Sequence, residues 1–314
     1  MRLILGGSYD LTEYVLTRPR VKSVSNVVNG GLYLPETSIS LKYRRGLFDT
    51  ATPVFKPDVS VEIYNDSGDL VFFGYLRGVQ QTYTETTLSC VHYLNKALSG
   101  NVNFSATASH PANILATFFD SIGQAHQGIL SHASRYPAML AQVFAVPENG
   151  VKAYDFISSL CDIMSLDIVV DAGIVYGIDR TQTESPYPVK SMAYPQVIDD
   201  GTSRQVKGCN LRYLFDADIP FAVGQQTEYC WSADYGPNNY LQIFGAASAQ
   251  EVCKAKLDRL ATPKQVIQLK CRADGYLPRI GLVYLLDIGP VRGYYRVIGQ
   301  ETDGELWYPM LEAV

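Results

Sequence analysis

PDVSVEIYNDSGDLVFFGYLRGVQQTYTETTLSCVHYLNKAL, residues 57–98, is the stretch that decides the fold. Val59, Val61 and Ile63 alternate with more polar residues, which is the period of a strand that buries one face and exposes the other. The run Asn65-Asp66-Ser67-Gly68 then favours a hairpin turn, because its side chains can hydrogen-bond the backbone and its glycine accepts a positive φ.

Two further strands follow this turn. Residues 70–76 are rich in aromatic side chains, and residues 86–94 place Leu88, Cys90 and His92 on one face. Consecutive strands with short connections pair with each other. Residues 57–98 therefore predict a three-stranded meander.

The bulk composition predicts a globular protein of two or three domains. The chain has 314 residues, of which 47% are hydrophobic and 18% charged, so long disordered stretches are not expected. Tyrosine is abundant at 22 residues, beside 25 glycines and 16 prolines. This composition favours β-structure with many turns and with large amphipathic contact surfaces.

The net charge of −5 argues against binding nucleic acid through phosphate neutralisation. Lys42, Arg44 and Arg45 form the one compact basic cluster, and a solvated strand end explains them better than a phosphate contact. Asn29-Gly30-Gly31 lacks the third glycine, the helix and the lysine of a nucleotide-binding loop, so we interpret it as a turn. We therefore expect no cofactor.

The six cysteines show no metal-binding or redox spacing, and we expect reduced thiols in a core. They are Cys90, Cys161, Cys209, Cys230, Cys253 and Cys271. The short apolar run at 3–5 ends at Gly6-Gly7, so no secretion signal is expected, and no run approaches the length of a membrane span.

The remaining elements before residue 98 are predicted strands. They lie at residues 3–5, 14–16 and 38–42, and together with the meander they define a first β-barrel domain, residues 1–98. A helical and loop insertion, residues 99–150, follows. Its helix is predicted to begin at Ser109-His110-Pro111 and to end at Gly123. His110, His126 and His132 lack ligand spacing, so we predict no metal site there.

Residues 151–190 predict a small α/β unit. A helix carries Tyr154, Leu160 and Met164 on one face, and a hairpin then turns at Asp171-Ala172-Gly173. Residues 181–205 are interpreted as a linker from their Thr, Ser, Pro and Tyr content. Asp199-Asp200 within it is interpreted as a turn, because glycosidase carboxylates are separated across a cleft. We predict no catalytic residue.

Residues 191–314 predict a second β-barrel domain, which includes a helix at 248–262. Ser248 and Glu251 have the spacing of a capping box, and Pro263 ends the helix. The predicted strands lie at residues 208–215, 219–223, 240–244, 267–271, 280–286, 294–298 and 306–311. Residues 40–49 and 210–216 share a Leu-basic-Tyr and Phe-Asp pattern, which fits a chain with two related barrels.

Several segments resemble the phage tail hub family, in the order that the family shows. They are residues 61–76, VEIYNDSGDLVFFGYL; 87–98, TLSCVHYLNKAL; the loop at 46–49; the helix segment 155–161, DFISSLC; and 293–298, GYYRVI. The family has an acidic residue after the Ile280-Gly281 pair, where this chain has Leu282. The resemblance covers most of the chain.

The resemblance implies a β-rich α+β fold with two tail-tube-like barrels and intervening small α/β elements. It implies a structural virion protein, a homotrimeric hub ring that continues the tail tube and adapts sixfold symmetry to a threefold spike or fibre. A tube or distal tail protein would lie above the ring and a spike, fibre or tail-tip protein below. DNA would pass through the lumen without specific binding, and the ring would assemble in the bacterial host cytoplasm. Mild acidity is compatible with such a conduit.

Two other functional classes stay open. A carbohydrate-binding or fibre-like β protein would also be rich in tyrosine, and it would be distinguished by a shallow aromatic groove. A tail-associated peptidase or glycan hydrolase is the enzymatic alternative, but no nucleophile elbow or metal motif points to one. The barrel pattern runs to Val314, so we expect no appended enzymatic domain.

Overall fold

The computed structural model describes most of the chain. The described residues are 1–24, 31–43, 55–102, 106–143, 150–171, 173–181, 193–203, 207–214, 218–224, 230–237, 239–272, 280–303 and 305–314.

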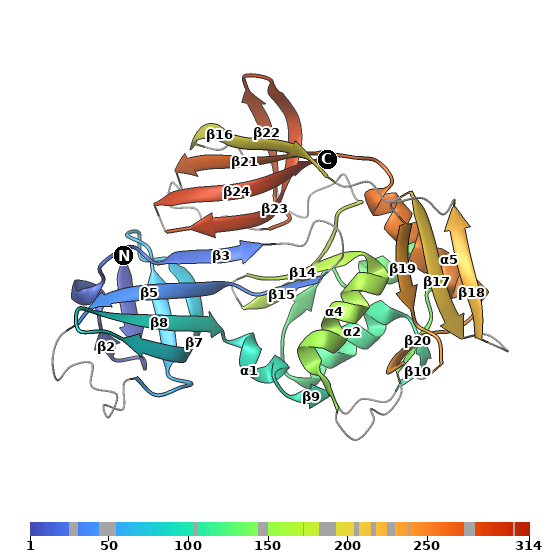
Figure 1. Cartoon of the computed structure of the whole chain (residues 1–314), viewed down its shortest axis with the longest axis horizontal. Coiled ribbons are helices and arrows are strands. Elements are labelled where there is room, and N and C mark those ends of the chain that lie inside the picture. Colours follow the sequence, from blue (N-terminus) through green and yellow to red (C-terminus); the bar gives the residue numbers. More distant parts are fainter. Residues whose placement is uncertain are drawn as a thin grey trace.

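One 12-stranded sheet connects the two ends of the chain. In Figure 1 its N-terminal strands lie at the left and its C-terminal strands at the top, with β3 between them. The N-terminal strands, in spatial order, are β3 (Arg20–Val24), β5 (Glu36–Lys42), β8 (Glu85–His92), β7 (Leu70–Gln81), β6 (Ser60–Tyr64), β1 (Arg2–Leu5) and β2 (Tyr9–Asp10). The C-terminal strands are β16 (Ala193–Thr202), β21 (Gln265–Arg272), β24 (Leu306–Ala313), β23 (Val291–Thr302) and β22 (Val283–Ile288).

The predicted meander is confirmed as β6, β7 and β8, which pair antiparallel in sequence order. The turn between β6 and β7 is fixed by Asn65, whose Oδ1 accepts a hydrogen bond from the backbone N–H of Asp69 at 2.8 Å. Gly68 has φ +85°, a value that favours glycine. Leu88, Cys90 and His92 are all buried on one face, as the alternation predicts.

The N-terminal strands curl around their own core. Residues 11–16 cross from β1 to β5: the N–H of Leu11 donates to the carbonyl of Leu3, and the N–H of Leu16 donates to the carbonyl of Ser40. The predicted strand at 14–16 is wrong, because this segment is a 3-10 turn, Thr12–Tyr14, followed by a single bridge from Val15 to Leu41.

The C-terminal strands curl in a similar way, and β16 lies near β22 without pairing with it (Figure 1). The linker prediction is wrong for residues 193–202, which form β16. Asp199 and Asp200 therefore lie in a strand and not in a turn, opposite Gln268 and Ile267 of β21. Composition misled the prediction because β16 is an exposed strand whose last four residues are all solvent-exposed.

The two halves of the sheet are a structural repeat. The spatial order β3-β5-β8-β7-β6 matches β16-β21-β24-β23-β22, strand by strand. The strands β7 and β23 each have 12 residues, and β8 and β24 each have 8. The β7–β8 ladder and the β23–β24 ladder each contain a register shift at a glycine: Gly78 faces Ser89, and Gly299 faces Met310.

The repeat differs from the one that the sequence pattern suggests. Residues 210–216 include the end of β17 (Gly208–Leu214), which belongs to a separate three-stranded sheet with β18 (Asp218–Gly224) and β19 (Cys230–Asp234). The counterpart of β5 is β21, because β5 pairs with β8 as β21 pairs with β24. The shared Leu-basic-Tyr pattern is therefore unrelated to the repeat.

The remaining elements, which we call the middle, pack at one end of this sheet, at the right of Figure 1. Its helices are α1 (Leu94–Leu98), α2 (Pro111–Ser121), α3 (Ser131–Arg135), α4 (Ala153–Met164) and α5 (Ala246–Leu260). Its other strands are β4 (Gly31–Tyr33), β9 (Asn101–Val102), β10 (Ala106–Ser109), β11 (His126–Gln127), β12 (Ala141–Val143), β13 (Val151–Lys152), β14 (Leu166–Asp171), β15 (Ile174–Asp179) and β20 (Leu241–Ile243). The predicted helices at 109–123 and 154–164 are confirmed, as are the strands that flank the predicted turn at residues 171–173.

Two helix starts differ in detail from the predictions. The cap of α2 is His110, whose Nδ1 accepts a hydrogen bond from the N–H of Ala112 at 3.0 Å. The predicted capping box is wrong, because α5 begins after Gly245 and Ser248 lies inside the helix. Ser248 and Glu251 instead hold the neighbouring loop: Ser248 Oγ accepts from the N–H of Leu140 at 3.1 Å, and Glu251 Oε2 accepts from the N–H of Ala138 at 2.6 Å.

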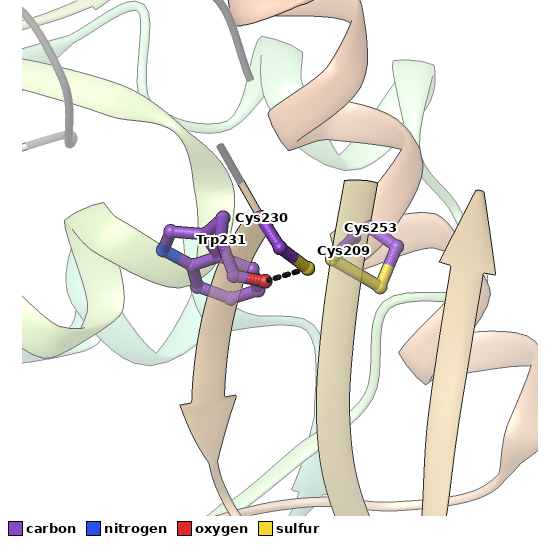
Figure 2. Close-up of a disulfide and its surroundings, with 4 residues drawn as sticks. All are labelled: Cys209, Cys230, Trp231 and Cys253. Atoms are coloured by element: carbon purple, nitrogen blue, oxygen red, sulfur yellow. Dashed lines mark hydrogen bonds between the residues drawn. A yellow bond between two sulfur atoms is a disulfide. The ribbon is translucent and has the colours of Figure 1, made fainter. Parts of the chain in front are cut away.

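The cysteine prediction is wrong for one pair. Cys209 on β17 and Cys253 on α5 form a disulfide (Figure 2). Their spacing of 44 residues gives no sequence signal, because the pairing depends on how α5 packs on β17. Of the free cysteines, Cys230 is half-buried and the others are buried, namely Cys90, Cys161 and Cys271.

The β-rich α+β class is confirmed, but two closed barrels are not. The described strands form two curled halves that share one sheet, because β3 pairs with both β5 and β23. The division into domains at residues 98, 150 and 190 stays a prediction. Among the described residues, no helix combines the length and apolar character needed to cross a membrane.

Candidate assembly surface

The two halves of the sheet meet at a ladder that we call the seam, residues 21–24 of β3 and 299–302 of β23. The strands are antiparallel, with Thr302 opposite Val21 and Glu301 opposite Lys22. Sequence reasoning missed β3 altogether. Its five residues, Arg-Val-Lys-Ser-Val, alternate in polarity, but the run is short and carries two cations.

Ion pairs cross the seam on its exposed side. Arg20 Nη1 lies 3.0 Å from Glu301 Oε1, and the guanidinium also lies 5.5 Å from the ring centre of Tyr308. Arg18 lies 2.9 Å from Asp66 in the turn after β6 and 3.7 Å from Glu305 in the turn before β24. These pairs are exposed, so each contributes less than about 1 kcal/mol and their main effect is on register.

A continuous open face runs across the seam. Residues paired across neighbouring strands lie on the same face of a sheet, and here the row passes through Tyr308, Glu301, Lys22, Glu36, Val91 and Tyr75. None of these six residues is buried. A depression in this face is lined by Arg20, Lys22, Glu36, Thr37, Ser38, Arg77, Ser89, Cys90, Val91 and Glu301. Its charges are of both signs, so it favours neither DNA nor an acidic partner.

The C-terminal half of the sheet is anchored to the middle by buried ions. Arg180 Nε donates to Asp167 Oδ2, and Arg180 Nη1 lies 4.0 Å from Glu312 Oε1 on β24. Arg259 of α5 donates to Asp167 Oδ1 at 3.2 Å. Burial disfavours the charged form of Arg180, but the carboxylates of Asp167 and Glu312 outweigh it and raise its pKa. Such a cluster is costly to break, because each partner removed leaves a buried charge.

A second buried ion lies between α4 and α5. Lys256 Nζ donates to Asp162 Oδ1 at 2.6 Å and lies 4.8 Å from the ring centre of Trp231 on β19. Burial lowers the pKa of Lys256 to about 8, against the opposing effect of Asp162. This lysine joins both helices to the three-stranded sheet. We assign it a structural role, because its side chain is fully enclosed.

The structure separates most of the residues that the sequence singles out. Lys42 is exposed at the end of β5, whereas Arg44 and Arg45 lie outside the described residues. The rings of His110 and His132 lie 5.8 Å apart, and each ring Nε2 makes a hydrogen bond with a backbone carbonyl, that of Tyr136 and that of Met164. His126 instead contacts Asp120 at 3.2 Å. The described residues contain no metal-binding cluster.

No protein-family model and no curated protein matches the chain by sequence. Solved structures do match it. The 43 kDa tail protein of prophage MuSo2 from Shewanella oneidensis shares 9% identity over 99% of this chain and 97% of its own, with a TM-score of 0.62. A tail protein from Neisseria meningitidis MC58 shares 11% identity over 99% of this chain and 95% of its own, with a TM-score of 0.60.

A third match comes from a secretion system. The Escherichia coli c3393 protein is described as a component of the type VI secretion system with structural similarity to the T4 bacteriophage tail proteins gp27 and gp5. It shares 10% identity over 100% of this chain and 77% of its own, with a TM-score of 0.55. The chain therefore has the fold of phage tail proteins, as its resemblance to the tail hub family implies.

Proposed function

We propose that the chain is a structural component of a phage tail tip or baseplate, a hub ring that continues the tail tube. The observation that carries this proposal is the match to tail proteins over 99% of the chain, which includes both halves of the sheet and the middle. No part of the proposal requires catalysis, and we propose that the protein is not an enzyme.

The structural repeat supports a role in matching symmetries. A chain with two related halves presents two similar units, so a closed ring of three chains presents six. Such a homotrimer could contact a sixfold tail tube or distal tail protein above and a threefold spike, fibre or tail-tip protein below. The protein would assemble in the host cytoplasm and reside in the virion.

The open face supports a conduit. It crosses the seam from Tyr308 of β24 to Tyr75 of β7 and carries charges of both signs, and the chain as a whole has a net charge of −5. A surface without a clustered positive field does not hold DNA through its phosphates. We propose that this face lines the lumen, where DNA passes without specific binding.

Light scattering of the purified chain at several concentrations tests the proposal. We expect a stable particle of three times the 34.7 kDa chain mass, and we expect it to bind a purified tail-tube protein in a pull-down. A strict monomer that binds neither tube nor spike proteins would contradict the hub ring. It would favour the glycan-binding or hydrolase alternatives, which a glycan array and a cell-wall hydrolysis assay would separate.

A further inference from the structure

Two histidines of the middle are buried with fixed protonation. His110 and His132 are 6% and 2% exposed, and their rings lie 5.8 Å apart. Nδ1 of His110 accepts a hydrogen bond from the N–H of Ala112 at 3.0 Å, so this nitrogen carries no proton. Its Nε2 therefore carries the proton and donates it to the carbonyl of Tyr136 at 2.8 Å. The His110 ring is neutral in this arrangement.

His132 has the same tautomer. Its Nε2 lies 2.7 Å from the carbonyl oxygen of Met164, so Nε2 is the donor. Among the described residues, nothing makes a hydrogen bond with the buried Nδ1 of this ring. A proton on it would be an unpaired charge in a buried site, which is costly. A proton on Nδ1 of His110 would displace the N–H of Ala112 and remove the cap of α2.

The charges around the pair do not offset this cost. Asp179 of β15 favours a charged His132, but it is already paired with Arg135 of α3 at 2.9 Å. Arg135 and His110 oppose a positive charge on His132. Burial is the largest effect and lowers the pKa of His132 to about 4, and it lowers the pKa of His110 as well.

The two histidines hold one segment, residues 129–140, which contains α3 and which we call the α3 segment. His110 binds the carbonyl of Tyr136 from the start of α2, and His132 of the segment binds the end of α4. Ile129, Tyr136 and Met139 of the segment are buried. Helix α5 contacts the segment at the N–H of Leu140, the N–H of Ala138, and the ring and hydroxyl of Tyr136, through Ser248, Glu251, Lys254 and Asp258 respectively.

We propose that acid releases the α3 segment, because protonation of His110 and His132 detaches it from α2 and α4. Two positive rings 5.8 Å apart would also repel each other in the closed arrangement. Release exposes the side chains of Ile129, Tyr136 and Met139. The 12-stranded sheet contains neither histidine, so it keeps its pairing. This release belongs to the single chain and needs no assembled ring.

Hydrogen exchange of residues 129–140 at pH 7 and pH 5, corrected for the intrinsic rates, measures the release. The released His132 binds a proton at its ordinary pKa, whereas the pKa of the buried ring is about 4, so release becomes more favourable as pH falls through this window. His132 alone should lower the protection of the segment about 20-fold between pH 7 and pH 5, and His110 should add to this loss.

Two results of this experiment would overturn the proposal. Equal protection of the α3 segment at the two pH values would show that acid does not release it. A loss of the same size in β23 and β24 would show that the chain opens as a whole and that the segment is not released by itself.

Non-titrating variants identify the groups that take up the protons. His110→Asn keeps a cap for α2, and His132→Gln keeps a donor for the carbonyl of Met164. The double variant should lose less than about 2-fold protection between pH 7 and pH 5. The matched control is His126→Asn, because His126 is half-buried beside Asp120 at 3.2 Å and its protonation strengthens that pair. The control should keep the wild-type response, and a double variant that also keeps it would overturn the proposal.

An NMR titration gives the same test on the wild-type chain. With 13C-labelled histidine, we expect the resonances of His110 and His132 to titrate over the pH range in which the α3 segment loses protection. Loss of protection while both rings stay neutral would overturn the proposal. Circular dichroism melts at pH 7 establish that each variant is folded, and the NMR titration decides if the double variant is not.

Discussion

The two halves of the sheet have the same strand order and register but different surroundings. Tyr75 of β7 is half-exposed on the open face, whereas its counterpart Arg296 of β23 is 3% exposed against the middle of the chain. Val91 of β8 is likewise half-exposed, whereas its counterpart Glu312 is buried. One β scaffold thus serves as an anchor in one copy of the repeat and as an open surface in the other.

A change in the buried ion cluster around Asp167, which anchors the C-terminal half, should have the largest effect on stability. Asp167→Asn removes the charge that two buried arginines share, Arg180 and Arg259, and we expect it to lower the free energy of unfolding by about 3–5 kcal/mol. Urea denaturation measures the change. The control is Asp287→Asn, whose ion pair with Arg292 lies on the exposed hairpin of β22 and β23. It should cost less than about 0.5 kcal/mol, and equal losses in the two variants would show that the cluster is not an anchor.

Loss of the disulfide should have the second-largest effect on stability, and the disulfide belongs to neither half of the repeat. Reduction of Cys209–Cys253 frees β17 from α5, and we expect a loss of about 2–4 kcal/mol. Hydrogen exchange should rise in β17 and α5 while β7 and β23 keep their protection. The double variant Cys209→Ser with Cys253→Ser should be insensitive to reductant. A uniform rise in exchange over the whole sheet would instead show that the disulfide supports both halves.

Acid should distinguish the halves. Burial lowers the pKa of His92 on β8 to about 4, and its counterpart on β24 is Ala313. Between the ordinary histidine pKa and about 4, the unfolded chain binds a proton that the folded chain does not, so stability falls as pH falls through this window. From pH 7 to pH 5 His92 contributes a loss of about 2 kcal/mol, and His132 in the middle, whose pKa burial also lowers to about 4, adds to the loss.

His92→Ala places in the first half the residue that the second half has, and it should reduce this pH dependence by the contribution of His92 while that of His132 remains. Hydrogen exchange across pH 5–7 would locate the effect, with β8 losing protection before β24. Equal loss of protection in both strands would contradict the prediction.

The smallest effect concerns the seam. A double-mutant cycle of Arg20→Ala and Glu301→Ala should give a coupling of about 0.2–1 kcal/mol, because Arg20 is largely exposed. The control cycle combines Arg20→Ala with Asp287→Ala, because Asp287 lies on the hairpin at the other end of β23 and pairs with Arg292. This control cycle should show no coupling, and equal coupling in the two cycles would contradict a specific contact across the seam.

Sequence reasoning found the elements that carry a strong period. The meander at 57–98 and the helices α2 and α4 follow from the alternation of Val61 and Ile63 and from the helical spacing of Ile157, Leu160 and Met164. It missed β3, which is short and carries two cations although it lies inside the sheet, and β16, whose last four residues are exposed. Pairing partners, and not periodicity, decide such segments.

The repeat was also hidden from the sequence. Its equivalent core positions hold different residues, as Leu76 and Val297 or Cys90 and Leu311 do, because a core requires apolar volume and not identity. Gly78 and Gly299 are kept at the register shift, but one shared glycine is no signal among 25. The assembly surface could therefore be identified only from strand pairing.

Amide hydrogen exchange at the seam tests the central claim most directly, which is that β3 joins the two halves of the repeat into one sheet. Gln300 and Thr302 of β23 pair with Ser23 and Val21 of β3 within the same chain. We predict that the N–H groups of Gln300 and Thr302 are protected from exchange at every protein concentration. Protection that appears only as the concentration rises would contradict the claim, because the partner strand would then come from another chain.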